Sequence, residues 1–79
     1  MNINRIDLNL FIVLDAIYTE GSLTRAAQRL HLSQPAISHA LGRLRKMLDD
    51  PLFVRQGGTM IPTALTRNLI TPVRSALAT

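Results

Sequence analysis

Apolar residues recur every three or four positions along most of this chain, a spacing that predicts α-helices. Four stretches show it: about 8–19, about 23–31, 33–48, and 63 to the C-terminus. Each begins at or just after a residue whose side-chain oxygen suits an N-cap, namely Asp7, Ser22, Ser33 and Thr63. Gly21 fits the position after the first helix, where glycine readily takes a left-handed conformation. The pattern therefore predicts a mostly α-helical fold.

Between the third and fourth helices the pattern changes to that of a β-hairpin. Pro51 ends the third helix, because proline disfavours helix in the residue before it. The segments 52–55 and 59–61 read as short strands, and Gln56-Gly57-Gly58 has turn chemistry, which places Arg55 near the tip. The second and third helices are joined by a short turn in which Leu32 is expected to point inward. These features together predict a winged helix-turn-helix, with three helices and a two-stranded wing, followed by a further helix.

The last helix has two unusual features. Its apolar stripe continues to the final residues, and nothing remains in the chain to cover it, so we expect it to meet a second copy or to belong to a longer protein. Pro72 interrupts the helical pattern and predicts a kink or a break at about Thr71.

The polar flank of the third helix indicates an anionic partner. At about 100° per residue, Ile37, Leu41 and Leu44 fall on one arc, and the opposite arc is polar. That polar arc begins with small uncharged groups, ends with cations and has no acid before Asp49. Small groups let the backbone approach a surface closely, and the cations suit a negatively charged one.

Composition and charge support the same interpretation. Nine Lys and Arg against five Asp and Glu in 79 residues give a net charge of +4, and no acid occurs between Gly21 and Leu48. A single basic domain of this kind favours nucleic acid as its partner, ahead of a membrane surface. The absence of cysteine excludes disulfides and thiolate metal sites. His31 and His39 have no third ligand in view, so we expect neither a metal nor a cofactor.

Several segments resemble the N-terminal domain of LysR-type bacterial transcription regulators: Leu23-Thr24-Arg25-Ala26-Ala27, Leu32-Ser33-Gln34-Pro35-Ala36-Ile37-Ser38, Pro51-Leu52-Phe53-Val54-Arg55 and Pro62-Thr63-Ala64. The resemblance covers nearly the whole chain in order. It implies a DNA-binding domain at 1–62, with the helix-turn-helix at about 22–48 and the wing at about 51–62. It also implies that 63–79 begins a linker helix that pairs two subunits. A C-terminal domain that binds a small-molecule effector is expected beyond this chain, in a cytoplasmic bacterial protein.

The resemblance and the charge pattern supply the candidate site residues. The resemblance places Gln34, Pro35, Ser38 and His39 at the major groove, where a glutamine carboxamide can pair with adenine. It makes Ser33, Arg43 and Arg55 candidates for the backbone or the minor groove, and the charge pattern adds Arg25, Arg29, Arg45 and Lys46. Arg45 departs from the family, in which many members have an acid there. The residues expected at the dimer contact are Leu65, Leu69, Ile70, Val73 and Leu77.

The sequence favours sequence-specific binding of double-stranded DNA by a homodimer over two other classes of function. The chain could be an interaction module whose basic face is incidental, but the acid-free segment beside a basic wing favours DNA. An enzyme has no support, since the sequence offers no carboxylate pair and no nucleophile beside a base.

Overall fold

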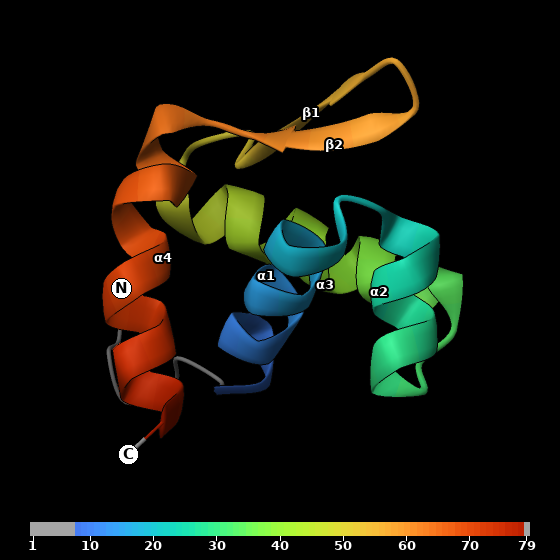
Figure 1. Ribbon diagram of the computed structural model, residues 1–79, viewed down its shortest axis with the longest axis horizontal. Coiled ribbons are helices and arrows are strands. Elements are labelled where there is room, and N and C mark those ends of the chain that lie inside the picture. Colours follow the sequence, from blue (N-terminus) through green and yellow to red (C-terminus); the bar gives the residue numbers. More distant parts are fainter. Residues whose placement is uncertain (1–7, 79) are drawn as a thin grey trace.

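The computed structural model describes residues 8–78, so the proposed cap at Asp7 lies outside the described residues. Within that range the chain forms a winged helix-turn-helix followed by a fourth helix, as predicted (Figure 1). The elements are α1 (Leu8–Glu20), α2 (Leu23–Leu30), α3 (Gln34–Leu48), β1 (Phe53–Gln56), β2 (Thr59–Pro62) and α4 (Ala64–Ala78).

Helix α1 is the centre of the hydrophobic core. It lies between α2 and α4 in Figure 1 and packs against α2, α3 and α4. Leu14 and Ile17 are fully buried, and α3 contributes Ile37, Leu41 and Leu44 to the same core. The buried residues of α2 are the small Ala26 and Ala27, which lets the helix approach α1 and α3 closely, and Leu23 and Leu30 pack beside them. The core therefore fixes α3 by one face and leaves the opposite flank free.

Serine caps begin both α2 and α3, and His31 caps the end of α2 in the turn between them. Ser22 and Ser33 accept hydrogen bonds at 3.2 Å from the amides of Arg25 and Ala36, which confirms both predicted N-caps. His31 ends α2 with a φ of 57°, the left-handed conformation that glycine usually supplies. The chain thus makes the turn of a helix-turn-helix without a glycine.

The prediction that Leu32 points inward is wrong, because 43% of the residue is exposed. The left-handed residue at His31 reverses the chain, and the amide of Leu32 then donates to the carbonyl of Ala27 at 2.9 Å, which closes the end of α2. This geometry turns the Leu32 side chain outward, where it lines a shallow groove with Ile12 and Leu30.

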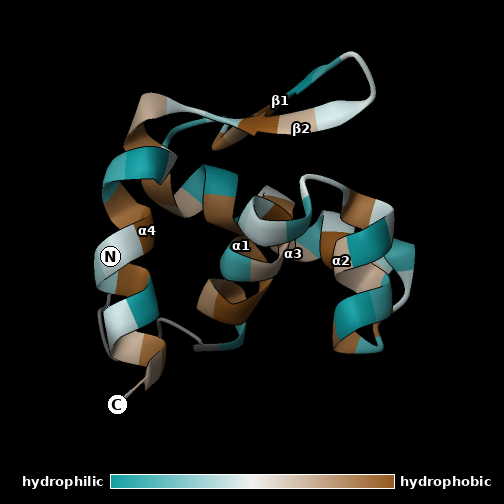
Figure 2. Cartoon of the chain, viewed as in Figure 1, coloured by the Kyte–Doolittle hydropathy of each residue, from teal (hydrophilic) through white to brown (hydrophobic). Residues whose placement is uncertain are grey.

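The wing is a two-stranded antiparallel hairpin whose register pairs Phe53 with Pro62 and Arg55 with Met60. Gly57 and Gly58 form its turn, both with positive φ. The prediction that Gln56 belongs to the turn is wrong, because Gln56 pairs with Thr59 as the last residue of β1. The base of the hairpin is hydrophobic and its outer part hydrophilic (Figure 2). The amide of Met60 donates to the carbonyl of Gly21 at 2.9 Å, which attaches β2 to the loop between α1 and α2.

A polar cluster joins the end of α3, the wing and the start of α4. Oδ2 of Asp50 accepts from the Leu52 amide at 2.8 Å and from the Thr63 hydroxyl at 2.7 Å. The hydroxyl of Thr66, which is fully buried, donates to the carbonyl of Leu52 at 2.7 Å. Thr63 also accepts from the Thr66 amide at 3.4 Å, as expected for the N-cap of α4. These bonds hold Leu52 in a left-handed conformation with a φ of 65°.

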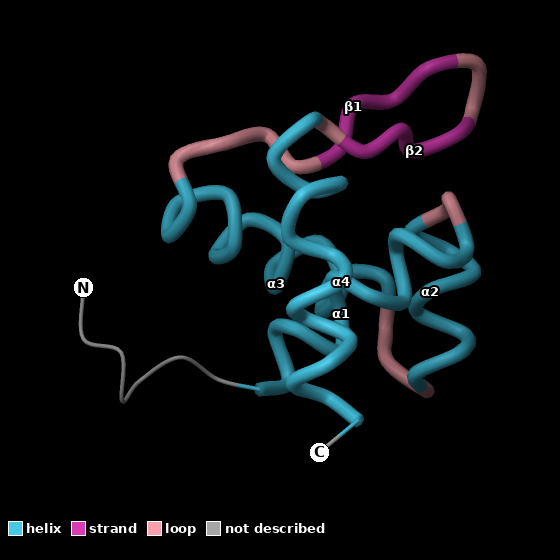
Figure 3. The backbone as a smooth tube through the Cα atoms, turned by 60° about the vertical axis from the view of Figure 1, so that its left-hand side comes forward, coloured by secondary structure: helices cyan, strands magenta, loops and turns pink. Residues whose placement is uncertain are grey.

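Helix α4 corrects two predictions. A kink or a break was predicted at about Thr71. The helix runs from Ala64 to Ala78 through Pro72, so the break does not occur, and the kink stays a prediction. Proline already has a helical φ and removes one hydrogen bond, and packing on both sides of Pro72 holds the helix together. Ile70 and Val73, expected at a dimer contact, are buried within this chain, with 6% of each exposed. The view in Figure 3 shows α4 passing over α1, against which it packs. The stripe is therefore covered in part by α1.

Candidate nucleic-acid interface

The free flank of α3 carries the four residues predicted to read bases. Gln34, Pro35, Ser38 and His39 are all exposed, and they follow the N-cap Ser33 within the first turns of the helix. Pro35 fits the first turn because no intrahelical hydrogen bond is lost there. The sequence places no acidic side chain on this flank before Asp49. The structure thus brings these residues together on one surface that the chain itself does not cover.

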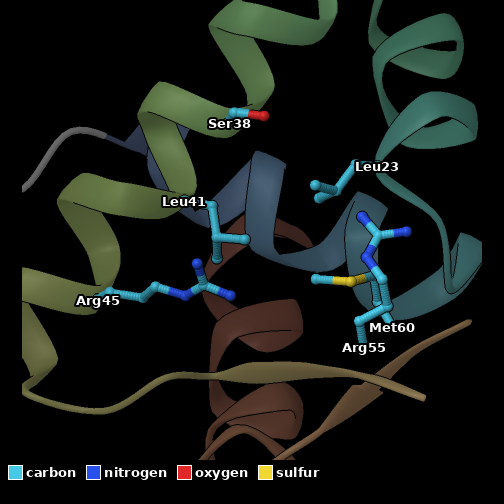
Figure 4. Close-up of a pocket in the computed structure, with 6 residues that line it drawn as sticks. All are labelled: Leu23, Ser38, Leu41, Arg45, Arg55 and Met60. Carbon is cyan, nitrogen blue, oxygen red and sulfur yellow. The ribbon is translucent and has the colours of Figure 1, made fainter.

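A notch of about 200 Å³ lies between α3 and the wing. Ser38, Leu41 and Arg45 line it from α3, and the other lining residues are Leu23, Arg55 and Met60. Figure 4 shows the guanidinium of Arg55 between Leu23 and Met60. The notch opens beside the exposed flank of α3, so a nucleic-acid strand bound to that flank would lie next to the opening of the notch. Two arginines and a hydroxyl line it, a composition that suits an anion.

Arg55 lies on the inner face of the wing. Residues on one face of a strand alternate, and Arg55 shares the inner face with the buried Phe53 and stands opposite Met60. It belongs to the hairpin close to its tip, as predicted, but it faces α2 and α3 across the notch (Figure 4).

The structure gives Arg45 different partners from the phosphate predicted for it. Its Nε donates to the carbonyl of Pro51 at 2.7 Å, and its second terminal nitrogen donates to the carbonyl of Phe53 at 3.1 Å. Both acceptors are backbone atoms at the base of β1. A signal for this was present in the sequence, since Arg45 lies within about 40° of Leu41 on the helical wheel, at the border of the apolar arc.

The remaining basic candidates are exposed but differ in their surroundings. Arg43 and Lys46 stand on α3, and Arg25 on α2. Arg29 forms an ion pair with Glu20 at 3.2 Å, and 47% of its side chain is exposed. One of the four is therefore already paired with an acid of this chain.

Sequence reasoning missed Leu23 and Met60 as walls of the notch. Both have the apolar character of core residues, and only the docking of the wing beside α2 reveals their place. Among residues 8–78 no group of three or more His, Cys, Asp or Glu side chains could hold a metal ion. None of the helices in that range is long and apolar enough to span a membrane.

Comparisons with known proteins agree with this geometry. The profile described as "Bacterial regulatory helix-turn-helix protein, lysR family" matches residues 8–67. Nodulation protein D 2 of Bradyrhizobium elkanii is 49% identical over 77 residues, which are 98% of this chain and 23% of that protein. Nodulation protein D 1 of Rhizobium meliloti (strain 1021) is also 49% identical, over 98% of this chain and 25% of that protein. The chain thus spans about a quarter of the length of these relatives.

Solved structures show the same fold. The probable transcriptional regulator PA0477 from Pseudomonas aeruginosa superposes with a TM-score of 0.90 at 49% identity, over 95% of this chain and 25% of that one. The CbnR_DBD–DNA complex superposes with a TM-score of 0.86 at 26% identity, over 92% of this chain and 84% of that one.

Proposed function

Because the chain belongs to the LysR family of bacterial regulatory helix-turn-helix proteins, we propose that it is the DNA-binding domain of a transcription regulator. We infer that it recognises specific sequences in double-stranded DNA. The observation that carries this proposal is the free flank of α3. It is exposed, begins with small uncharged side chains and has no acidic side chain before Asp49. The CbnR relative, whose DNA-binding domain is solved with DNA, supports the same function.

In the proposed complex α3 enters the major groove with its N-terminal half. Small residues at the start of the helix allow close approach, and the Gln34 carboxamide can pair with the N6 and N7 of adenine. Ser38 and His39 can donate or accept hydrogen bonds at neighbouring base edges. Pro35 offers an apolar surface to a thymine methyl group. The N-terminus of α3, capped by Ser33, adds the partial positive charge of the helix dipole.

The phosphate contacts are assigned to the exposed cations. Arg43 and Lys46 on α3 are the first candidates, and Arg25 on α2 is the next. Such contacts supply affinity without sequence information. Arg29 contributes less because Glu20 neutralises it. Arg55 is the wing residue proposed at the backbone or in the minor groove, beside the notch.

We also infer a homodimer that forms through α4, so that two α3 helices meet two related half-sites. Three of the residues predicted for this contact, Leu65, Leu69 and Leu77, are only partly buried within the chain. A nearly apolar groove remains beside them, lined by residues of α1, α4 and the end of α3: Phe11, Leu14, Leu48, Leu69, Pro72, Val73 and Ala76. Ile70 and Val73 are assigned to the core of the single chain instead.

The domain division proposed is a DNA-binding unit at 1–62 and the start of a linker helix at 63–79. Since the chain covers about a quarter of its relatives, we place the effector-binding domain in the remainder of the protein. A small-molecule effector belongs to that domain, and we assign this one neither cofactor nor enzymatic activity. A cytoplasmic location fits a protein that acts on DNA.

The experiment that tests the function is selection of bound sites from a pool of random duplex DNA. We expect enrichment of one motif, with an affinity that falls steeply as salt rises because phosphate contacts release counterions. An interaction module with an incidental basic face gives retention on DNA without an enriched motif. That result, or no retention at low salt, contradicts the proposal.

A further inference from the structure

Arg45 is the residue that links the two DNA-facing elements of this domain. Its side chain leaves α3 one turn after Leu41 and reaches the carbonyls of Pro51 and Phe53, at 2.7 and 3.1 Å. These two acceptors bracket Leu52, at the point where the chain enters the wing. Arginine donates from a planar fork, which can hold two acceptors in a fixed geometry. A side chain of α3 itself therefore helps to set the position of β1, in addition to the bonds of Asp50 and Thr66 around Leu52 and the burial of Phe53.

The second strand is held independently of Arg45. The amide of Met60 donates to the carbonyl of Gly21 at 2.9 Å, on the side of the wing that faces α2. The Arg45 contacts therefore fix the other edge of the hairpin. With both edges held, Arg55 stands across the notch from Ser38 (Figure 4).

We propose that Arg45 is a positioning residue for DNA binding, which braces the wing against α3 so that Arg55 and the α3 flank engage one duplex together. This inference rests on the proposed function. It replaces the direct phosphate contact predicted from charge alone, because Nε and one terminal nitrogen of Arg45 already donate to the base of β1. Loss of the brace removes the contribution of Arg55 while the contacts of Gln34 remain.

The test uses the 79-residue chain and the motif enriched from the random pool. Arg45→Lys keeps the positive charge but replaces the fork by a point charge that cannot hold both carbonyls. We expect it to weaken binding by about tenfold, close to the loss in Arg55→Ala, since both variants remove the one charged contact that Arg55 makes with DNA. The double variant binds no more weakly than Arg55→Ala alone. Arg67→Lys, at an exposed arginine of α4 outside the candidate interface, is the matched control, and it retains nearly full affinity.

A phosphate contact by Arg45 gives a different pattern. Arg45→Lys then binds like the unaltered chain, or the losses of Arg45→Lys and Arg55→Ala multiply in the double variant. Either result overturns the proposal. If the unaltered chain enriches no motif, the proposed function fails first, so the two failures are distinguishable.

Hydrogen exchange of the DNA-free protein provides a second measurement. In Arg45→Lys we expect faster exchange at the wing amides that bond across the hairpin, such as that of Val54, and unchanged exchange in the centre of α1. Wing exchange equal to that of the unaltered chain overturns the proposal. Equal acceleration in α1 and the wing also overturns it, because Arg45 then supports the whole fold rather than the wing.

Discussion

Arg74 on α4 and Asp15 on α1 form an ion pair with 2.7 Å between Nε and Oδ1, across 59 positions of sequence. A terminal nitrogen of Arg74 also donates to the Thr19 hydroxyl at 3.0 Å, and its guanidinium carbon lies 5.2 Å from the centroid of the Tyr18 ring. This one side chain joins three residues of α1 to α4, beside the buried contacts of Ile70 and Val73.

We expect Arg74→Ala to lower the free energy of unfolding by only about 0.5–1 kcal/mol, because exposed ion pairs are weakened by water and salt. About half of the Arg74 side chain is exposed, at 48%. Urea unfolding at low and high salt measures the loss, which should shrink as salt rises. Arg67→Ala, at an exposed arginine on the same helix, is the control. Strictly additive losses in Arg74→Ala and Asp15→Ala show that the pair contributes nothing.

Gln34→Ala and Ser38→Ala should weaken binding to the selected motif much more than binding to random duplex DNA. A bidentate glutamine–adenine pair is worth about 1–3 kcal/mol of discrimination, so we expect about a tenfold or greater loss for Gln34→Ala on the motif. Ser38→Ala should cost less, since a hydroxyl specifies little by itself. Titrations against both DNAs at one salt concentration provide the comparison.

The control for the glutamine is Gln28→Ala, at an exposed position on α2. We expect that variant to keep its preference for the motif. Equal losses of Gln34→Ala on the motif and on random DNA contradict base reading by this residue.

His31→Gly should stabilise the domain. A φ of 57°, as at His31, raises the energy of the folded state for a residue with a Cβ but not for glycine. Glycine also gives the unfolded chain more freedom, which offsets part of this gain. The balance predicts a gain of about 0.5–1 kcal/mol in unfolding free energy. Thermal unfolding compares it with His31→Ala, which retains the Cβ and should gain nothing. A destabilised glycine variant means that the imidazole contributes more than the backbone strain costs.

Thr66→Val tests the polar cluster at the base of the wing. The substitution keeps a β-branched shape but removes the buried hydroxyl that donates to Leu52. The Leu52 carbonyl retains the Thr63 amide at 2.9 Å, so we expect a moderate loss of about 1 kcal/mol. The same change at the exposed Thr71 of α4 is the matched control and should cost far less. Similar values at both positions show that the buried bond adds nothing to stability.

The helices and the wing could be predicted because their signals are local. Apolar spacing and the caps Ser22, Ser33 and Thr63 act within one or two turns, and the structure confirms them. Leu32 was misjudged because hydrophobicity does not reveal which way a side chain points after a left-handed residue. The break, one of the two outcomes predicted at about Thr71, does not occur because packing against α1 outweighs the local cost of proline.

The candidate site divides in the same way. The exposure of Gln34 and Ser38 follows from the period of one helix, which the sequence reveals directly. The partners of Arg45 are carbonyls of the next segment, and their positions depend on how the chain turns through Asp50 and Leu52. The notch requires the wing to dock beside α2 and α3, a long-range arrangement that periodicity does not encode.

The register of the wing limits how this hairpin can change in length during evolution. Phe53 and Met60 are buried on its inner face, and Val54 is exposed on the outer one. Inserting or deleting one residue between Phe53 and Arg55 moves the guanidinium to the opposite face, away from α3. Length polymorphism among natural homologues should therefore occur in steps of two residues on this strand, or be confined to the glycine turn.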